Sequence, residues 1–118
     1  MRFLTLVKAA ENLGPPPKSY LEGMVKVRRE AMEAGVVITT GGLAPSAQGA
    51  RIRVSQGRLV VTDGPFTEAK EVIGGYAVVE HPSREAAIEA GRKLMELQVR
   101  LWPGWEGEME VRQMYEAR

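Results

Sequence analysis

The order in which strand-like and helix-like segments follow one another constrains this chain most. Alternating or β-branched runs predict strands at residues 3–7, 36–40, 51–54, 59–62, 72–80 and 109–115. Amphipathic stripes predict one helix between Ser19 and Gly35 and another between Ser83 and Pro103. The resulting order is β-α-β, a hairpin, and β-α-β, which is the split β-α-β arrangement of the ferredoxin-like fold. We therefore expect one α+β domain over residues 1–118.

Three local patterns refine this prediction. Ser19 and Glu22 have the S-x-x-E spacing of a capping box at the start of the first helix. Ser83 has a suitable side chain for the N-cap of the second helix. The Gly74–Gly75 pair lies inside a predicted strand, where it indicates a bulge or a close approach of two backbones.

The first strand has apolar side chains on both of its faces. Phe3 and Val7 lie on one face, and Leu4 and Leu6 lie on the other. A domain of this size has no second layer of helices to cover the other face of the sheet. A second copy packed sheet to sheet would cover it, so we expect a homodimer with twofold symmetry.

Composition and charge exclude several classes of protein. Sixteen basic and fifteen acidic residues give a net charge of +1, too balanced for a nucleic-acid or membrane-surface protein. No apolar run approaches the roughly 20 residues of a membrane span, and the N-terminal residues do not resemble a signal peptide. With no cysteine, one histidine and one aspartate, the chain is poorly equipped to bind a metal. We expect a cytoplasmic protein without metal or cofactor.

One run of the sequence is specific enough to suggest a family. Residues 63–71 read Asp-Gly-Pro-Phe-Thr-Glu-Ala-Lys-Glu, and residues 73–76 read Ile-Gly-Gly-Tyr. Residues 107–112 read Gly-Glu-Met-Glu-Val-Arg. Together these runs resemble the YCII-related family in its DGPF branch, over residues 2 to about 116. The resemblance implies a dimeric α+β barrel built from ferredoxin-like protomers.

The resemblance itself implies little about function, because most of the family has no established activity. Some members of the wider family resemble small lyases or isomerases that act on aromatic or lactone-like substrates, with a His–Asp pair proposed to move protons. Members of the DGPF branch are often associated with extracytoplasmic-function sigma factors, which implies a regulatory link. In this sequence no histidine precedes His81, so the usual partner of Asp63 is missing.

Asp63 is the candidate catalytic residue, as a general base or a substrate anchor at the end of a strand. Its alternative role is that of a turn former that accepts hydrogen bonds from nearby N–H groups. The candidate ligand-binding residues are Gly64, Pro65, Phe66, Glu68, Lys70, Glu71, Tyr76 and Trp105. The alternative for the charged ones is a solvated loop, and for the aromatic ones a core or interface position.

Three functions are compatible with these residues. The first is a small-ligand-binding or regulatory homodimer. The second is a cofactor-independent lyase or isomerase that uses Asp63. The third is a structural protein in which the loop of residues 63–71, which we call the DGPF loop, only builds the dimer. The ligand-binding or regulatory homodimer is the prediction that we carry forward, and whether the chain is an enzyme stays open.

Overall fold

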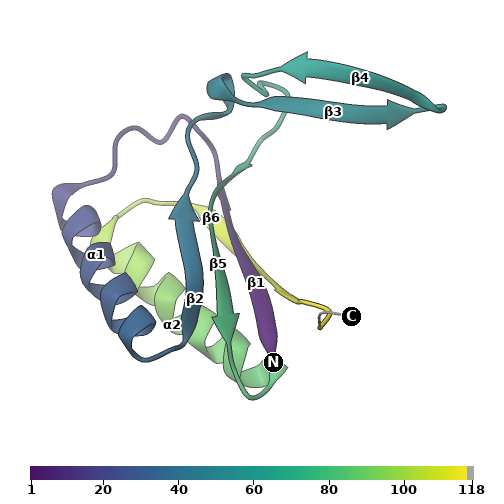
Figure 1. Cartoon of the computed structure of the whole chain (residues 1–118). Helices are drawn as coiled ribbons and strands as arrows, with labels where there is room; N and C mark the ends of the chain where they lie inside the picture. The colour runs from purple at the N-terminus through teal and green to yellow at the C-terminus, as the bar shows by residue number, and fades with distance from the viewer. Residues whose placement is uncertain (117–118) are drawn as a thin grey trace.

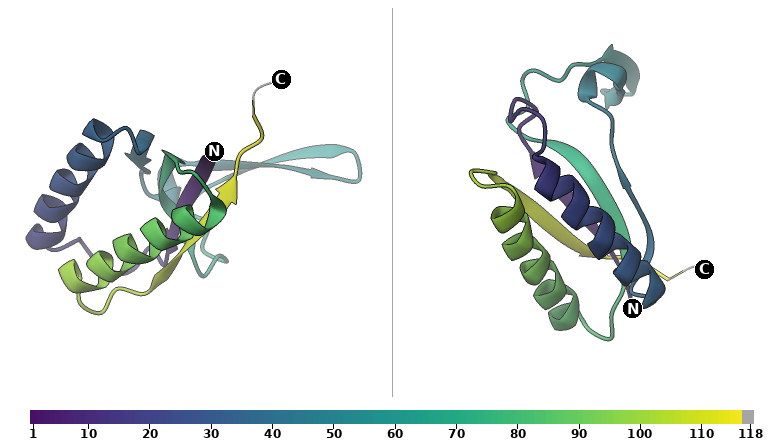
Figure 2. Two further views of the ribbon diagram at one scale, coloured as in Figure 1. Left: turned by 90° about the horizontal axis from the view of Figure 1, so that it is seen from below. Right: turned by 90° about the vertical axis from the view of Figure 1, so that its left-hand side faces the viewer.

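The computed structural model, which describes residues 1–116, contains a four-stranded antiparallel sheet in the order β2-β5-β1-β6 (Figure 1). Its strands are β1 (Arg2–Ala9), β2 (Val37–Gly42), β5 (Val72–Glu80) and β6 (Gly107–Gln113). Helices α1 (Lys18–Glu33) and α2 (Arg84–Leu101) both lie on one face of this sheet (Figure 2). This strand order with two helices on one face confirms the predicted ferredoxin-like α+β fold.

Strand β1 lies inside the sheet, and its alternation separates two faces. Phe3 pairs with Val79 on the face that the helices cover, and Leu4 pairs with Val78 on the other face. Phe3, Val79 and Ala87 of α2 form the buried core, with Phe3 only 1% exposed. We call the opposite side, which carries Leu4 and Val78, the open face, because neither helix covers it (Figure 2).

The two helices begin differently. Helix α1 starts after Pro17 without a side-chain cap, and the Ser19 hydroxyl instead donates a hydrogen bond to the carbonyl oxygen of Leu101 at 3.2 Å. The predicted capping box is therefore wrong, because this hydroxyl joins the two helices. Helix α2 follows the prediction, since the Ser83 hydroxyl accepts a hydrogen bond from the backbone N–H of Ala86 at 3.1 Å.

The predicted bulge is confirmed in β5. Val7 of β1 pairs with Gly75, and the next residue, Lys8, pairs with Ile73, so Gly74 is the extra residue. The bulge lies where β5 enters the sheet. The strand continues from this point as the neighbour of both β1 and β2.

Strands β3 (Ala50–Ser55) and β4 (Arg58–Asp63) form a separate hairpin, which we call the arm. Gln56 and Gly57 make its turn with φ values of 52° and 77°, as a two-residue type I′ turn requires. The arm extends from the end of the sheet, on the side away from the helices (Figure 1). The sequence predicts one solvated and one buried face for β3, yet Ile52 and Val54 are 70% and 72% exposed. Nothing within residues 1–116 covers the apolar face of the arm.

The outer surface of α2 is polar. Arg92 lies between Glu89 and Glu96 and forms ion pairs with both, at 2.6 Å for the pair with Glu89. The two carboxylates raise the pKa of Arg92. These pairs are solvent-exposed and contribute little to stability. Neither α1 nor α2, the two long helices of residues 1–116, is apolar enough over its length to cross a membrane.

Candidate functional site

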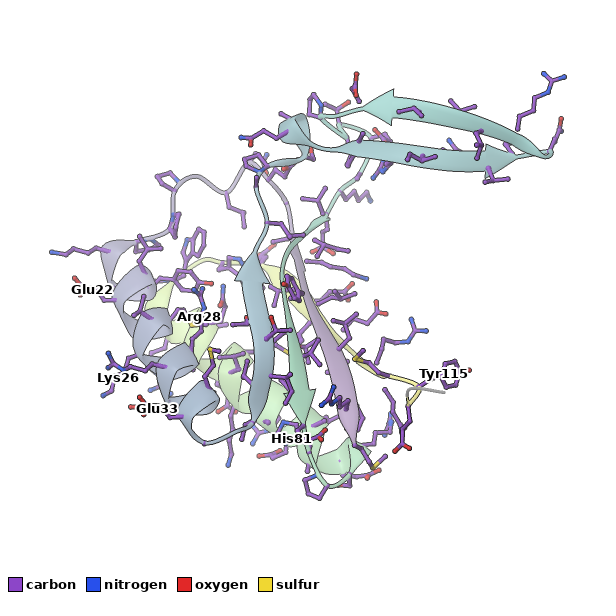
Figure 3. The ribbon with its side chains drawn as sticks, viewed as in Figure 1. Glu22, Lys26, Arg28, Glu33, His81 and Tyr115 are labelled. Carbon is purple, nitrogen blue, oxygen red and sulfur yellow. The ribbon has the colours of Figure 1, made fainter. Side chains whose placement is uncertain are left out.

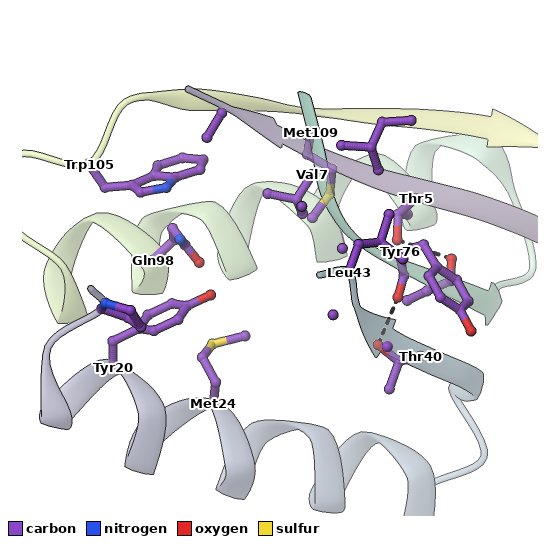
Figure 4. A pocket seen from close by; sticks show the side chains of 18 of the residues that line it. Thr5, Val7, Tyr20, Met24, Thr40, Leu43, Tyr76, Gln98, Trp105 and Met109 are labelled. Carbon is purple, nitrogen blue, oxygen red and sulfur yellow. Dashed lines mark hydrogen bonds between the residues drawn. The ribbon is translucent and has the colours of Figure 1, made fainter. Parts of the chain in front are cut away.

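A cavity of about 520 Å³ lies between the helices and the face of the sheet that they cover (Figure 4). Its walls are mainly apolar. Met24 and Val27 of α1 contribute to one wall, and Leu94 and Met95 of α2 contribute to another. The sheet contributes Thr5, Val7, Thr40, Ala77 and Met109. A volume of several hundred cubic ångströms with apolar walls is typical of small-molecule sites.

Close helix contacts at glycines and small residues elsewhere explain why this space is open. A Cβ at Gly91 would lie 2.9 Å from the Met109 sulfur, so α2 rests closely on β6. A Cβ at Gly23 would lie 2.6 Å from a methyl group of Leu101, so α1 touches the end of α2. Farther along the sheet the walls carry small residues, which leave volume unfilled. These are Ala9, Ala31, Gly41, Gly42, Gly74, Gly75 and Ala77.

One end of the cavity is aromatic. The rings of Tyr20 and Trp102 have their centroids 5.2 Å apart and are tilted by 57°, a common arrangement of aromatic pairs. Trp105 lines the same end and is half-buried (Figure 4). Both tryptophans of the chain therefore lie at the cavity, where their fluorescence can report on an occupant.

Gln98 supplies the polar group at this end. Its side chain is 3% exposed and points from α2 into the cavity, near Tyr20 and Trp105 (Figure 4). Among residues 1–116 no side-chain hydrogen bond involves this amide. Every side-chain nitrogen or oxygen atom there that is fully shielded from solvent has a hydrogen-bond partner, so the amide atoms of Gln98 are not fully shielded and open onto the cavity. By contrast, the Thr5 and Thr40 hydroxyls are already bonded to the carbonyl oxygens of Ala77 and Tyr76. Gln98 can thus donate and accept hydrogen bonds to a ligand.

The structure separates the residues predicted to bind a ligand into two places. Tyr76 and Trp105 line the cavity. Tyr76 borders the cavity with its backbone in β5. Strand alternation places its ring on the open face, opposite to Ala77 and beside Gly41. The other predicted residues lie outside the cavity lining, at the base of the arm. These are Asp63, Gly64, Pro65, Phe66, Glu68, Lys70 and Glu71.

Ser46, which begins the short helix η1 (Ser46–Gln48), organises the DGPF loop. Its hydroxyl accepts a hydrogen bond from the backbone N–H of Phe66 at 3.1 Å and donates one to the Glu11 carboxylate. Its own backbone N–H donates to Glu11 at 2.6 Å. A Cβ at Gly64 would overlap the Ser46 carbonyl oxygen, so no larger residue fits there. The glycine of the DGPF motif is thus required by packing.

The remaining side chains of the loop pack against the arm. The Arg51 guanidinium lies 3.8 Å from the centre of the Phe66 ring, a cation–π distance. The same guanidinium forms an ion pair with Glu68. The pKa of Glu68 is lowered by a backbone hydrogen bond and by Arg51. Phe66 and Glu68 therefore have structural partners in the arm.

The structure does not bring together the two residues considered for proton transfer. Asp63 is exposed at the end of β4, where the arm meets the rest of the chain. His81 follows β5 at the opposite end of the sheet, where its backbone N–H donates to the carbonyl oxygen of Met1 (Figure 3). Within residues 1–116, no group of three or more metal-ligating side chains converges on one point.

Sequence reasoning did not select Gln98 as a site residue. The residue lies on the apolar stripe of α2, between Leu94 and Trp102. A polar side chain inside an apolar stripe is the signal that could have identified it. The stripe predicts burial, but it does not predict that the neighbouring walls leave a space.

We expect Gly64→Ala to lower the free energy of unfolding by about 3 kcal/mol, because the new Cβ must displace the backbone of Ser46. Gly74→Ala is the matched control, since its Cβ would meet no atom closer than 4.0 Å. We expect it to change stability by less than about 1 kcal/mol. Urea unfolding followed by circular dichroism measures both. Equal effects of the two substitutions would contradict the packing argument.

Hydrogen bonds from the Ser46 hydroxyl and backbone N–H lower the pKa of Glu11. The stabilisation from the ionised carboxylate is therefore present above its ordinary pKa of 4.5 and is lost as the pH falls through the folded-state value. We expect the stability difference between the wild type and Glu11→Gln to stay constant from pH 7 down to about 4.5 and to shrink as the pH is lowered further. Thermal unfolding over this range measures it.

The control for this pH dependence is Glu33→Gln. Glu33 is exposed on α1 and takes part in none of the ion pairs among residues 1–116. The difference in stability between the wild type and Glu33→Gln should stay constant over the same pH range. A constant difference for Glu11→Gln as well would show that the Ser46 contact does not contribute through the charge of Glu11.

The family model of the YCII-related domain matches residues 1–99. An uncharacterised protein of Rhizobium meliloti (strain 1021) is 35% identical to the chain over 68 residues, which cover 58% of this chain and 55% of that protein. The match thus spans about half the length of this relative. Because the family model covers most of its residues, the chain belongs to the YCII-related family.

Proposed function

We propose that this protein is a homodimer that binds a small molecule in the cavity between its helices and its sheet. The observation that carries the proposal is the Gln98 amide, which is 3% exposed, points into the cavity and has no side-chain partner among the described residues. The amide atoms open onto the cavity, so they are available to hydrogen-bond to a molecule that occupies it. This supports a binding site over an unfilled packing defect.

The lining of the cavity favours one chemical class of ligand. The aromatic end formed by Tyr20, Trp102 and Trp105 suits a ring or another flat apolar group. Gln98 at the same end suits a group that both donates and accepts hydrogen bonds, such as an amide, a carboxylic acid or a hydroxyl. An aromatic molecule with one such group meets both requirements within a cavity of about 520 Å³.

The open face of the sheet supports the homodimer. Leu4 and Val78 are paired there, and Leu6 lies beside Tyr76 on the same side. At the margin the Lys8 ammonium contacts the Glu110 carboxylate at 2.6 Å, which raises the pKa of Lys8. An apolar centre with a polar margin is typical of a protein interface. A second copy packed against this face would bury the centre.

Ligand binding is favoured over catalysis by Asp63 because of where Asp63 lies. Its carboxylate is exposed at the base of the arm and is not part of the cavity lining. A general base must lie within hydrogen-bond reach of the substrate proton, and the cavity is the enclosed space suited to a substrate. A regulatory role linked to a sigma factor stays a prediction from the family resemblance.

The proposal is tested with benzamide, which carries a ring and an amide, and with ethylbenzene, which has a similar size but no polar group. We expect benzamide to raise the melting temperature and to change the fluorescence of Trp102 and Trp105. A ligand at 100 times its dissociation constant adds about 2.7 kcal/mol of stability. Gln98→Leu should weaken benzamide binding about tenfold, the equivalent of about 1.4 kcal/mol, and leave ethylbenzene binding unchanged.

Two further variants make this result specific. Gln113→Leu removes an amide from an exposed position on β6 and should bind benzamide as the wild type does. Ala31→Leu fills the cavity from α1 and should abolish binding of both probes while the protein stays folded. Equal benzamide affinity in the wild type and in Gln98→Leu would contradict the proposed site.

A further inference from the structure

We propose that the arm clasps a second copy of this chain, with its apolar face closing over the partner that sits on the open face of the sheet. The inference rests on the homodimer of the proposed function, but it does not depend on the ligand. It assigns a role to the arm, whose large apolar side chains nothing within residues 1–116 covers.

The strand register of the arm places four large apolar side chains on one face. Ile52 pairs with Val61, and Val54 pairs with Leu59, so all four point to the same side. Their exposed fractions are 70%, 65%, 72% and 71%, respectively. The other face carries Arg51, Arg53 and Arg58. The arm is therefore amphipathic, and its apolar side has no partner within residues 1–116.

The arm does not have the surroundings that a hairpin needs to be stable by itself. A two-stranded hairpin is marginally stable in water unless its apolar face packs against something. The radius of gyration of the chain is 15.9 Å, against the roughly 13–14 Å expected of a compact domain of this length. The base of the arm is held by the contacts of Arg51 with Phe66 and Glu68, and nothing else within residues 1–116 packs on its apolar face. A partner is expected to cover the rest.

The direction of the arm identifies a second copy as that partner. The helices and the arm extend to opposite sides of the sheet, so the arm extends over the side of the open face (Figures 1 and 2). A copy docked on Leu4, Leu6 and Val78 would lie within the reach of the arm. Twofold symmetry then gives each copy one arm that holds the other.

The size of a stable interface supports the same partner. A standard interface buries about 800 Å² on each partner, and a lone monomer rarely exposes apolar patches of more than a few hundred square ångströms. The apolar centre of the open face is small, with a margin made polar by Lys8 and Glu110. Four further large side chains on the arm bring the interface towards the standard size.

Adjacent valines on β4 provide a matched test. Val61 lies on the apolar face of the arm, whereas Val60 pairs with Arg53 on the other face. Both side chains are exposed in the single chain, at 65% and 49%, so lysine at either position leaves the protomer folded. We expect Val61→Lys to raise the dimer dissociation constant at least 100-fold and Val60→Lys to raise it less than threefold, measured by sedimentation equilibrium.

A second measurement uses the absence of cysteine from the chain. Val61→Cys and Val60→Cys each give a protein with a single thiol. A maleimide dye should modify the thiol at 61 slowly when the protein is concentrated and rapidly when it is diluted below the dissociation constant. The thiol at 60 should react rapidly under both conditions. Equal labelling rates at the two positions at high concentration would overturn the clasp.

The outcomes also separate this inference from the proposed function. A dimer that persists in both lysine variants overturns the clasp and leaves the sheet-to-sheet homodimer in place. A wild type that is monomeric at all concentrations overturns both the clasp and the homodimer. In either case the benzamide experiment on Gln98 tests the ligand site separately, because the cavity lies on the helix side of the sheet (Figure 4).

Discussion

Two helices can cover only one face of a four-stranded sheet, and the rest of this molecule follows from that limit. The core of Phe3, Val79 and Ala87 forms on the covered face. The helix layer approaches the sheet closely at Gly91, while small residues nearer the arm leave a cavity. The other face keeps Leu4 and Val78 without a helix over them. The cavity proposed as a ligand site and the proposed dimer interface are thus on the two sides of one sheet.

The DGPF loop connects these two sides to the arm. Gly64 packs on the backbone of Ser46, and Phe66 lies against Arg51 of β3. Ser46 is itself held by Glu11, in the segment that leads from β1 towards α1. Glu11 also borders the cavity. One small set of polar contacts therefore positions the base of the arm and one margin of the cavity.

The sequence predicted the fold well because local patterns decide it. Strand alternation, helical stripes, the Ser83 N-cap and the glycine bulge each follow from a few neighbouring residues, and the structure has all of them. The capping box predicted at Ser19 was wrong because the Ser19 hydroxyl donates its hydrogen bond to Leu101, which is 82 residues away along the chain. The site was harder to predict because a cavity depends on what the walls leave unfilled. Gln98 became recognisable only once its surroundings were known.

In the proposed function a ligand is recognised by the Gln98 amide, and NMR tests this most directly. The side-chain NH₂ signals of Gln98 can be assigned by their loss in Gln98→Leu and followed while benzamide is added to ¹⁵N-labelled protein. We predict saturable shifts of these signals and of the two tryptophan indole signals, with little change over residues 63–71. Unchanged Gln98 signals, with shifts confined to residues 63–71, would contradict the account and place the ligand at the DGPF loop.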